Sequence, residues 1–407
     1  MKTAIFLSLL TTACVGTITD VGPSQEPEPE PSGSIVTMKV RDGAVPQVDV
    51  KVLFQAPDDS LIAEVVTDEA GNATADMPKG GLVTVIRTYA PDAAGVDPLD
   101  HLYTYVGVKA GDKLELVGAL RSELVRIIKV KVNLDPGTPV TVSAPCGAGS
   151  GTAPVIELQL KGCAAEAPFL VVDNTDPADP LYFTAVAPIT PNIDFTAEDF
   201  RGRLTTDLRA ANPMAQAQVA MQKRLLQGTF TVFDTGKLPA PAAAAIPDLP
   251  KTQQIVSAWV TTADGRKFVT ASRDAFAPVP AFVDIATNQI PTTSAPTYLN
   301  NVVSWTEAGN GTVDLSIASI TAGSVGREFV RSVAAPYVST AMRVPPLPAA
   351  YDHYNIQPTD TPLIQHNLAR VTGGYDGARA RVFNYALADL APAGGTATAS
   401  CFAMSAP

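Results

Sequence analysis

Only three histidines offer acid–base chemistry near neutral pH in this sequence of 407 residues. His101 stands in LDHLY, His353 in YDHYN and His366 in LIQHN. No two of them have the spacing of a helical or finger-type metal site, and no Cys-x-x-Cys occurs. The sequence also lacks a G-x-S-x-G elbow, a P-loop and a dinucleotide fingerprint. We therefore expect no catalytic residues and no cofactor; the alternative is a hydrolase that assembles Ser, His and Asp in three dimensions.

The best candidate for a ligand site is the polar run formed by Tyr351, Asp352, His353 and Tyr354. Two tyrosines around a histidine and an aspartate could bind a sugar or a peptide by stacking and hydrogen bonding. The alternative is a loop whose tyrosines fix it to the edge of a β-sandwich.

A second polar run, DNTDPADP, places Asp173, Asp176 and Asp179 in one loop. Carboxylates at the corner of a sandwich can bind Ca²⁺, which needs about six to eight oxygen ligands. The spacing differs from that of an EF-hand loop, and proline interrupts it. We expect a solvated turn and no metal, with calcium as the weaker alternative.

The elements that must position these residues are short strands. The 35 prolines and 29 glycines are dispersed and separate short apolar runs, which favours an all-β fold with many turns over long helices. The net charge of −11 repels phosphate backbones, so nucleic acid is not an expected partner.

The N-terminal stretch MKTAIFLSLLTTAC has a basic Lys2, a short apolar run and Thr-Thr-Ala before Cys14. The run is too short to span a bilayer. The stretch resembles a bacterial lipoprotein signal, which implies that residues 1–13 are removed and that Cys14 carries lipid. Thr11 departs from the leucine that the family usually has there, and an ordinary secretory signal cleaved near Ala13 is the alternative. Val15 after the cysteine implies, by the same resemblance, the outer membrane.

Residues 14–32 form an acidic, proline-rich linker. The Glu-Pro repeat at 26–31 favours extended geometry, and its glutamates repel one another. We expect a spacer between Cys14 and the first domain; a proline-motif ligand for another protein is the alternative.

Residues 33–119 contain about seven strand-like runs with turns every 8–12 residues, a pattern typical of an antiparallel sandwich. The run VDVKVLF and several turn residues resemble a carboxypeptidase-regulatory or transthyretin-like β-sandwich module. That resemblance implies an accessory domain without catalytic residues, in which Gly71 provides the backbone freedom of a turn. The turn residues that carry it are Gly43, Pro46, Thr67, Asp68, Gly71, Ala73, Pro78 and Gly80.

Residues 120–193 predict an Ig-like sandwich that contains Cys146 and Cys163. In an exported protein these two cysteines are expected to form a disulfide. If TPVTVSA and VIELQL formed a tight hairpin, the cysteines would lie at its opposite ends. The disulfide therefore requires GAGSGTAP to run back along the sheet. Cys401 is left over and could be a free, exposed thiol near the C-terminus.

Residues 194–407 predict further sandwich structure, as one domain or two. The segment Ala215–Gly228 has the start and stop signals of a helix but alternates polar and apolar residues like a strand, and we expect a strand. Trp259 and Trp305 are expected to be core anchors rather than ligand stackers.

The whole layout, with lipid signal, acidic spacer, transthyretin-like module and further sandwiches, resembles uncharacterised envelope lipoproteins common in myxobacteria. The resemblance brings no known activity. We expect a non-enzymatic protein that displays tandem antiparallel β-sandwiches for binding or structural support. Its partners would be the outer membrane, through the lipid, and an envelope protein or glycan. The alternatives are a secreted or surface carbohydrate- or peptide-binding protein and, third, a hydrolase.

Overall fold

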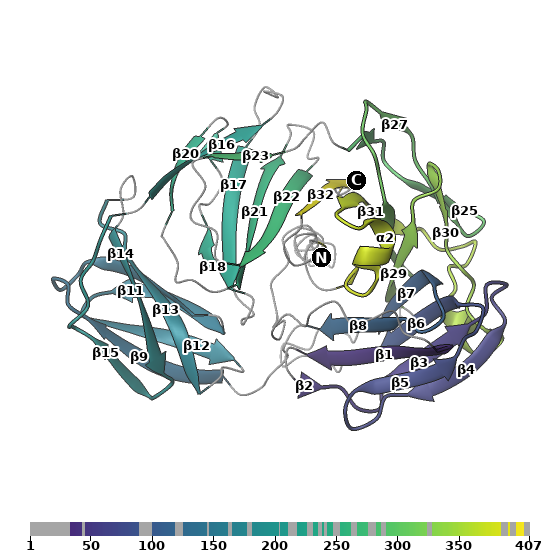
Figure 1. Cartoon of the computed structure of the whole chain (residues 1–407), viewed down its shortest axis with the longest axis horizontal. Coiled ribbons are helices and arrows are strands. Elements are labelled where there is room, and N and C mark those ends of the chain that lie inside the picture. Colours follow the sequence, from purple (N-terminus) through teal and green to yellow (C-terminus); the bar gives the residue numbers. More distant parts are fainter. Residues whose placement is uncertain are drawn as a thin grey trace.

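The computed structural model is described for residues 33–42, 45–88, 100–118, 125–144, 146–161, 165–176, 181–202, 204–210, 218–225, 231–234, 238–239, 242–246, 253–261, 267–275, 282–285, 290–323, 328–383, 390 and 396–402. Between 204 and 285 the description covers the backbone of the strands. The described regular structure is almost entirely β-strand, in several sheets, and the predicted all-β class is confirmed (Figure 1).

A large sheet runs through the molecule. Among the described strands, neighbours in this sheet come from both the N-terminal and the C-terminal parts of the chain. In spatial order it contains β18 (Thr231–Asp234), β17 (Gln218–Leu225), β21 (Gln253–Thr261), β22 (Lys267–Ala275), β32 (Thr396–Phe402), β31 (Leu363–Val371), β28 (Leu315–Ala322), β29 (Phe329–Pro336), β7 (Asp100–Val108), β6 (Gly81–Arg87), β3 (Lys51–Gln55) and β4 (Leu61–Val66), with β19 (Leu238–Pro239) paired to β17.

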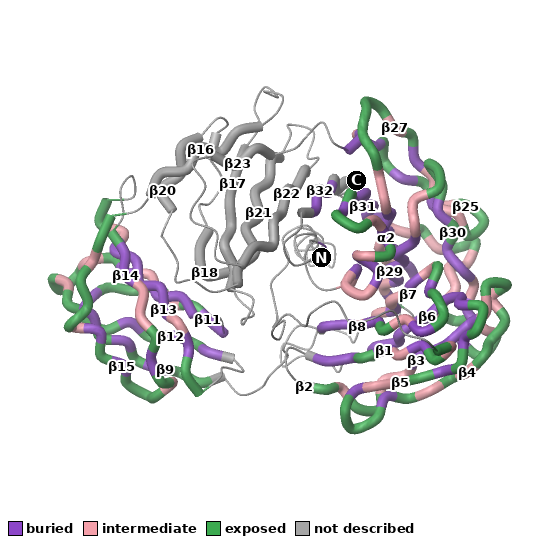
Figure 2. The backbone as a smooth tube through the Cα atoms, viewed as in Figure 1, coloured by how far each residue is buried: buried purple, intermediate pink, exposed green. Residues whose placement is uncertain are grey.

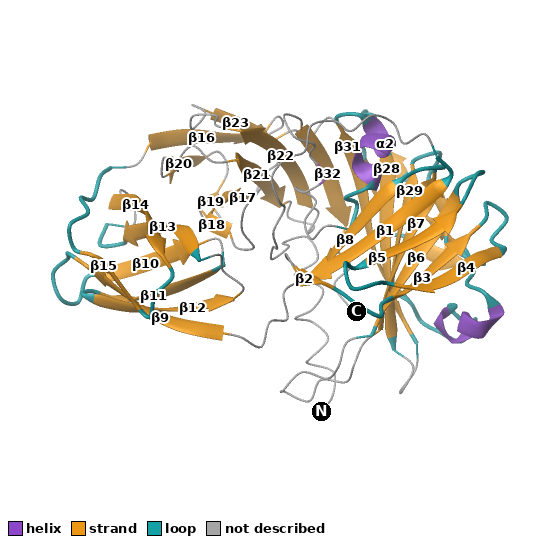
Figure 3. Ribbon diagram, turned by 60° about the horizontal axis from the view of Figure 1, so that its bottom comes forward, coloured by secondary structure: helices purple, strands orange, loops and turns teal. Residues whose placement is uncertain are grey.

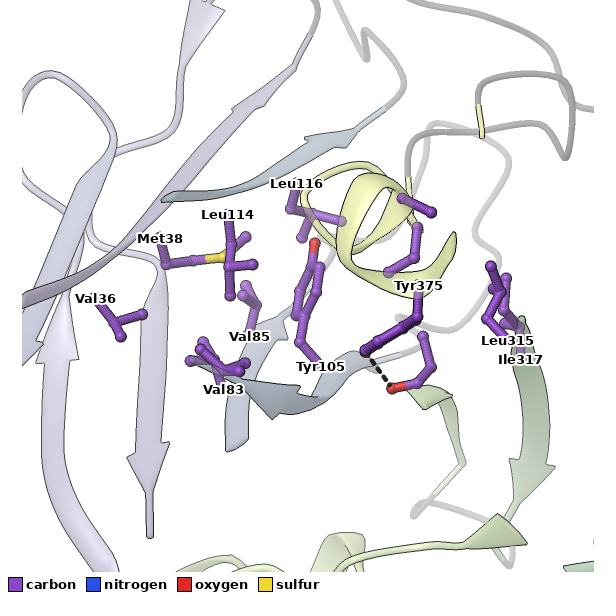
Figure 4. Close-up of a cluster of buried hydrophobic side chains, with 14 of the residues drawn as sticks. Val36, Met38, Val83, Val85, Tyr105, Leu114, Leu116, Leu315, Ile317 and Tyr375 are labelled. Atoms are coloured by element: carbon purple, nitrogen blue, oxygen red, sulfur yellow. Dashed lines mark hydrogen bonds between the residues drawn. The ribbon is translucent and has the colours of Figure 1, made fainter. Parts of the chain in front are cut away.

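A smaller sheet packs on one face of the β4–β3–β6–β7 end. Its strands are β1 (Ile35–Asp42), β2 (Val45–Pro46), β5 (Asn72–Asp76) and β8 (Lys113–Gly118). The central strand, β1, pairs antiparallel with β2 and β5 and parallel with β8. Alternate residues of β1, among them Val36 and Met38, point inward and are buried against the large sheet (Figure 4).

The turns of this N-terminal part have the scaffold role that the sequence predicts. Gly71 has φ +77°, and a Cβ there would lie 2.4 Å from the carbonyl oxygen of Val40, so only glycine fits. Thr67 is buried, and its hydroxyl donates to the Gln47 carbonyl oxygen at 2.6 Å. The Asp68 carboxylate accepts hydrogen bonds from two backbone amides of the same turn.

The N-terminal part is not a closed module. β7 pairs in parallel with β29, more than two hundred residues later in the chain. The same core that contains Val36 and Tyr105 also contains Leu315, Ile317 and Tyr375 (Figure 4). The segments 33–119 and 194–407 therefore share one sheet and one core, a continuity that the sequence patterns do not predict. Pairing with β29 covers the edge that β7 would otherwise expose.

The opposite face of the large sheet carries a second core, which includes Leu53, Leu102, Phe329 and Trp305. Short strands and a 3₁₀ helix cover it. They are β24 (Thr292–Thr293) paired with β27 (Glu307–Ala308), the sheet β25 (Thr297–Leu299), β26 (Val302–Ser304) and β30 (Ala341–Arg343), and η1 (Ala349–Tyr354). The helix α2 (Gly374–Arg379) follows β31.

A separate unit between β8 and residue 202 is an Ig-like sandwich with its own core, which includes Val130, Val142, Phe169 and Phe183 (Figures 1 and 2). One sheet has the order β11 (Gly147–Thr152), β10 (Pro139–Ala144), β13 (Glu166–Asp173), β14 (Leu181–Pro188). The other has the order β12 (Val155–Lys161), β9 (Val125–Val132), β15 (Asn192–Phe195).

The predicted backward path of GAGSGTAP is strand β11. It runs antiparallel to β10, with Ala144 opposite Gly147, before the chain crosses to β12. A Cβ on Gly149 would lie 2.4 Å from the carbonyl oxygen of Glu157, so glycine allows β11 and β12 to approach closely. Cys146 is buried and disulfide-bonded, whereas Cys163 lies outside the described residues. The pairing of Cys146 with Cys163 thus stays a prediction.

The ambiguous segment at 215–228 contains strand β17, as predicted. Nearby, β16 (Leu204–Ala210), β20 (Ala242–Ile246) and β23 (Phe282–Ile285) form a three-stranded sheet. The backbone of Cys401 lies within β32, opposite Lys267 on one side and Asn367 on the other. Its side chain lies outside the described residues, so a free, exposed thiol stays a prediction.

Candidate functional site

The predicted ligand residues lie on η1, which covers the face of the large sheet that carries the second core, near its β3–β4 end (Figure 3). Pro348 precedes the helix with extended backbone angles, and Asn355 ends it. Tyr351 is buried in the second core, and Tyr354 packs against that core. The tyrosines therefore anchor η1 to the sheet, as the scaffold alternative expects.

The segment 343–356 around η1 is tied to the sheet by polar contacts as well. The Asn355 side-chain oxygen accepts the backbone amide of Leu347 at 2.9 Å within the segment and a guanidinium N–H of Arg331 in β29 at 3.4 Å. The fully buried Arg331 donates to the Pro345 carbonyl oxygen, and burial lowers its pKa to about 10. Arg343 forms an ion pair with Asp59 in the β3–β4 turn. We name residues 343–356 the covering segment.

A pocket of about 740 Å³ opens between η1 and the sheet. It is bounded by the loop before β3, by β4, by the end of β6 and by η1. The lining residues are Gln47, Val48, Asp49, Val50, Lys51, Glu64, Ile86, Arg87, Thr88, Ala350, Tyr351, His353 and Tyr354. Three of the four predicted ligand residues thus line one pocket. The fourth, Asp352, is exposed and is not in the lining; its carboxylate accepts a hydrogen bond from the Asn355 amide at 3.1 Å.

Charged and aromatic groups meet in this η1 pocket. The Lys51 ammonium lies 3.5 Å from a Glu64 carboxylate oxygen and 5.0 Å from the centroid of the Tyr351 ring. A hydrogen bond with Tyr351 raises the pKa of Lys51, and burial raises the pKa of Tyr351. Lysine is therefore charged and tyrosine neutral at pH 7, which leaves an ammonium, a carboxylate and a phenol side by side.

The remaining rings are held in place. The Tyr354 hydroxyl donates to the Asp100 carboxylate at the start of β7, and burial together with this bond raises the pKa of Tyr354 well above its usual range. The His353 ring lies 4.0 Å from the Tyr354 ring, centroid to centroid. Lys51, Glu64 and Asp100 are about 250 to 300 residues away from η1 in the chain, and no local pattern in the sequence links them to it.

The hydrolase alternative finds its nearest match in Ser316 and His366. The Ser316 hydroxyl lies 2.8 Å from His366 Nε2, and both residues are buried. Among the described residues, no hydrogen-bond partner reaches His366 Nδ1, where a triad would place a carboxylate. Burial lowers the pKa of His366 to about 3, and the centroid of its ring lies 3.9 Å from that of the Trp305 ring, with the two ring planes tilted by 34°. The pair is packed inside the second core.

The other expected residues are placed as follows. Trp305 is buried in the second core, as predicted, and its indole donates to Glu307 at 2.7 Å. The side chain of Trp259 lies outside the described residues. His101 lies in β7 and stacks on Tyr103, with ring centroids 6.3 Å apart.

In the aspartate loop, the Asp173 carboxylate accepts the amide and the hydroxyl of Thr175 at 2.9 and 2.6 Å. Asp176 is exposed, and Asp179 lies outside the described residues. No group of three or more metal-ligating side chains occurs in the described part of the chain. The calcium alternative gains no support from this turn geometry.

Cys14 and the rest of residues 1–32 lie outside the described residues, so the lipid signal and spacer stay predictions. Of the helices in the described ranges, none has the length and hydrophobicity needed to cross a membrane.

No protein-family model matches this chain, and no curated protein matches it. Among solved structures, the Bacillus anthracis TIE protein has 12% identity over 63% of this chain and a TM-score of 0.17. The FN1–FN3 domains of chicken CNTN1 have 9% identity over 71% of this chain and 89% of their own, with a TM-score of 0.15. BcpA, the major pilin subunit of Bacillus cereus, has 9% identity over 74% of this chain and 98% of its own, with a TM-score of 0.16. This chain spans 50% of the length of the TIE structure.

Proposed function

We propose that this chain is a non-enzymatic protein of the bacterial cell envelope that is anchored through lipid on Cys14 and displays its β-sandwich body as a ligand-binding surface. The observation that carries the binding part is the η1 pocket. It joins Tyr351, His353 and Tyr354 to Lys51 and Glu64 on a face of the large sheet. The lipid and spacer would hold this body away from the outer membrane.

The non-enzymatic part is supported by the site itself. The nearest serine–histidine pair is buried, and its imidazole is neutral because burial lowers its pKa to about 3. In the η1 pocket the Lys51 ammonium is paired with Glu64 and Tyr351, whereas a catalytic amine would need to be neutral. These features suit recognition better than proton or acyl transfer.

The test of the anchor is the intact mass of the protein extracted from its own cells without reductant. We expect a mass that fits a diacylated or triacylated chain beginning at Cys14, less the two hydrogens of one disulfide. The Cys14→Ala variant is the matched control and should leave the membrane fraction. An unlipidated wild-type mass would contradict the anchor and favour a secreted protein.

A further inference from the structure

The charge of the described lining of the η1 pocket is balanced. Among the described residues, the lining has two basic side chains, Lys51 and Arg87, and two acidic ones, Asp49 and Glu64. Such a lining has no net attraction for a phosphate, a polyanion or a cation. It does present donors and acceptors close together, since Lys51 and Glu64 are 3.5 Å apart. A neutral ligand with many hydroxyl groups can donate to the carboxylate and accept from the ammonium at the same time.

The pocket also presents flat apolar surface. His353 and Tyr354 have ring centroids 4.0 Å apart, and the Tyr351 ring lies 6.4 Å from that of His353. Aromatic faces next to hydrogen-bonding groups suit a ligand with one apolar ring face and a polar rim. A pyranose ring has that form, with C–H groups on its faces and hydroxyls around its edge.

The site is built before any ligand arrives. Asp100 holds the Tyr354 hydroxyl, the sheet buries Tyr351, and the Asn355 side chain binds the backbone amide of Leu347. Fewer groups have to be ordered on binding, which lowers its entropic cost. The volume, about 740 Å³, is within the range of small-molecule sites, about 300 to 1,000 Å³.

We propose that the η1 pocket binds a short neutral saccharide, with Lys51 and Glu64 hydrogen-bonded to adjacent hydroxyls and with His353 and Tyr354 against the ring face. This inference rests on the proposed binding function and names its ligand class. A peptide would instead be expected to add as a strand along the open edge of β4, where the side chains of Ile62 and Val66 are exposed.

The test is calorimetric titration of the purified full chain with four neutral probes: cellohexaose, chitohexaose, maltohexaose and xylohexaose. We expect saturable binding of at least one probe. Lys51→Met, Glu64→Met and His353→Ala should each weaken it roughly tenfold, because the first two remove a hydrogen bond to the ligand and the third removes a stacking face. Lys129→Met is the matched control and should bind like the wild type, since Lys129 pairs with Glu157 on the Ig-like unit.

Three outcomes would overturn the proposal: no saturable binding of any of the four probes, saccharide binding that the three pocket variants leave unchanged, or saturable binding of an extended apolar peptide that competes with the saccharide. The folding of each variant is checked by circular dichroism and urea unfolding. If no saccharide binds but the intact mass shows a lipidated Cys14, the ligand class is rejected and the anchor is not. An unlipidated chain that still binds a probe would reject the anchor alone.

Discussion

At the scale of single residues, His366 shows how burial decides chemistry. It has a serine at hydrogen-bond distance, which in a cleft would suggest nucleophilic catalysis. Here the ring is enclosed by the second core and packs against Trp305, so it is neutral over the physiological range. Another histidine, His353 in η1, is exposed and lines a pocket. Residue type alone does not distinguish these two environments.

We predict a dependence of stability on pH from this buried histidine. Its pKa is about 6.5 when unfolded and about 3 when folded, so the unfolded state binds the proton first as pH falls. Above pH 6.5 the contribution of His366 to the free energy of unfolding should be constant. As the pH falls from 6.5 to about 3, the free energy of unfolding should decrease by about 1.4 kcal/mol per pH unit. Urea unfolding of wild type and His366→Gln between pH 4 and 7 measures it. If the free energy of unfolding changes with pH equally in the two proteins, His366 is not the cause of that pH dependence.

At the scale of elements, short turns and close strand crossings determine where side chains lie. β11 shows this most clearly, because this six-residue strand of small residues carries the chain from Cys146 back to the end of the sheet where β10 begins, and β12 then returns toward the end where Cys146 lies. The covering segment is a second case. It has little regular structure of its own, and it is held against the sheet by the contacts of Arg331 with Asn355 and Pro345 and by the contact of Arg343 with Asp59.

The close approach of β11 to β12 gives a prediction with an internal control. Gly149→Ala should lower the free energy of unfolding of the Ig-like unit by about 1 to 3 kcal/mol, because the new Cβ would lie 2.4 Å from the Glu157 carbonyl oxygen. Gly151→Ala should have little effect, since the nearest atom, on Ile156, is 3.8 Å away. Urea unfolding followed by circular dichroism compares the two variants. Equal losses would refute the packing argument.

Helix α2 offers a second element-scale prediction. The buried Tyr375 hydroxyl shares its single proton between the carbonyl oxygens of Val106 in β7, at 2.5 Å, and Ala334 in β29, at 3.2 Å. Tyr375→Phe should therefore lower the free energy of unfolding by about 1 to 2 kcal/mol, because two buried acceptors lose a donor. Tyr298→Phe removes a hydrogen bond to Asn301 nearer the surface and should cost less. Chemical denaturation measures the free energy of unfolding of both variants. A larger loss in Tyr298→Phe than in Tyr375→Phe would contradict the role given to Tyr375.

At the scale of the whole molecule, the large sheet makes the two ends of the chain one structure. β7 of the N-terminal part pairs with β29, and β32 near the C-terminus lies between β22 and β31. The Ig-like unit between them differs, because the members of its core all come from residues 128–200. A chain that looks like three consecutive domains is thus organised as one discontinuous body and one inserted unit.

This organisation predicts how fragments behave. Residues 33–119 alone should bind a hydrophobic dye and show weak cooperativity in unfolding, because removing β29 and α2 exposes an apolar edge and part of the shared core. Residues 120–202 alone should fold cooperatively, since the described core of that unit comes from within it. Thermal unfolding and dye binding of both fragments test this. A stable, cooperative 33–119 fragment would mean that the shared core is dispensable.

The sequence by itself determined the fold class and many local features: the strand at 218–225, the turn at Gly71 and the burial of Trp305. These follow from short-range rules, namely period-two alternation, turn chemistry and the size of an indole ring. It also singled out η1, because tyrosines, aspartate and histidine are adjacent there. Tertiary structure alone decided that β7 joins β29 and that Lys51, Glu64 and Asp100 surround η1. Those contacts link residues far apart in the chain, where strand pairing depends on edges and buried faces that no local pattern encodes.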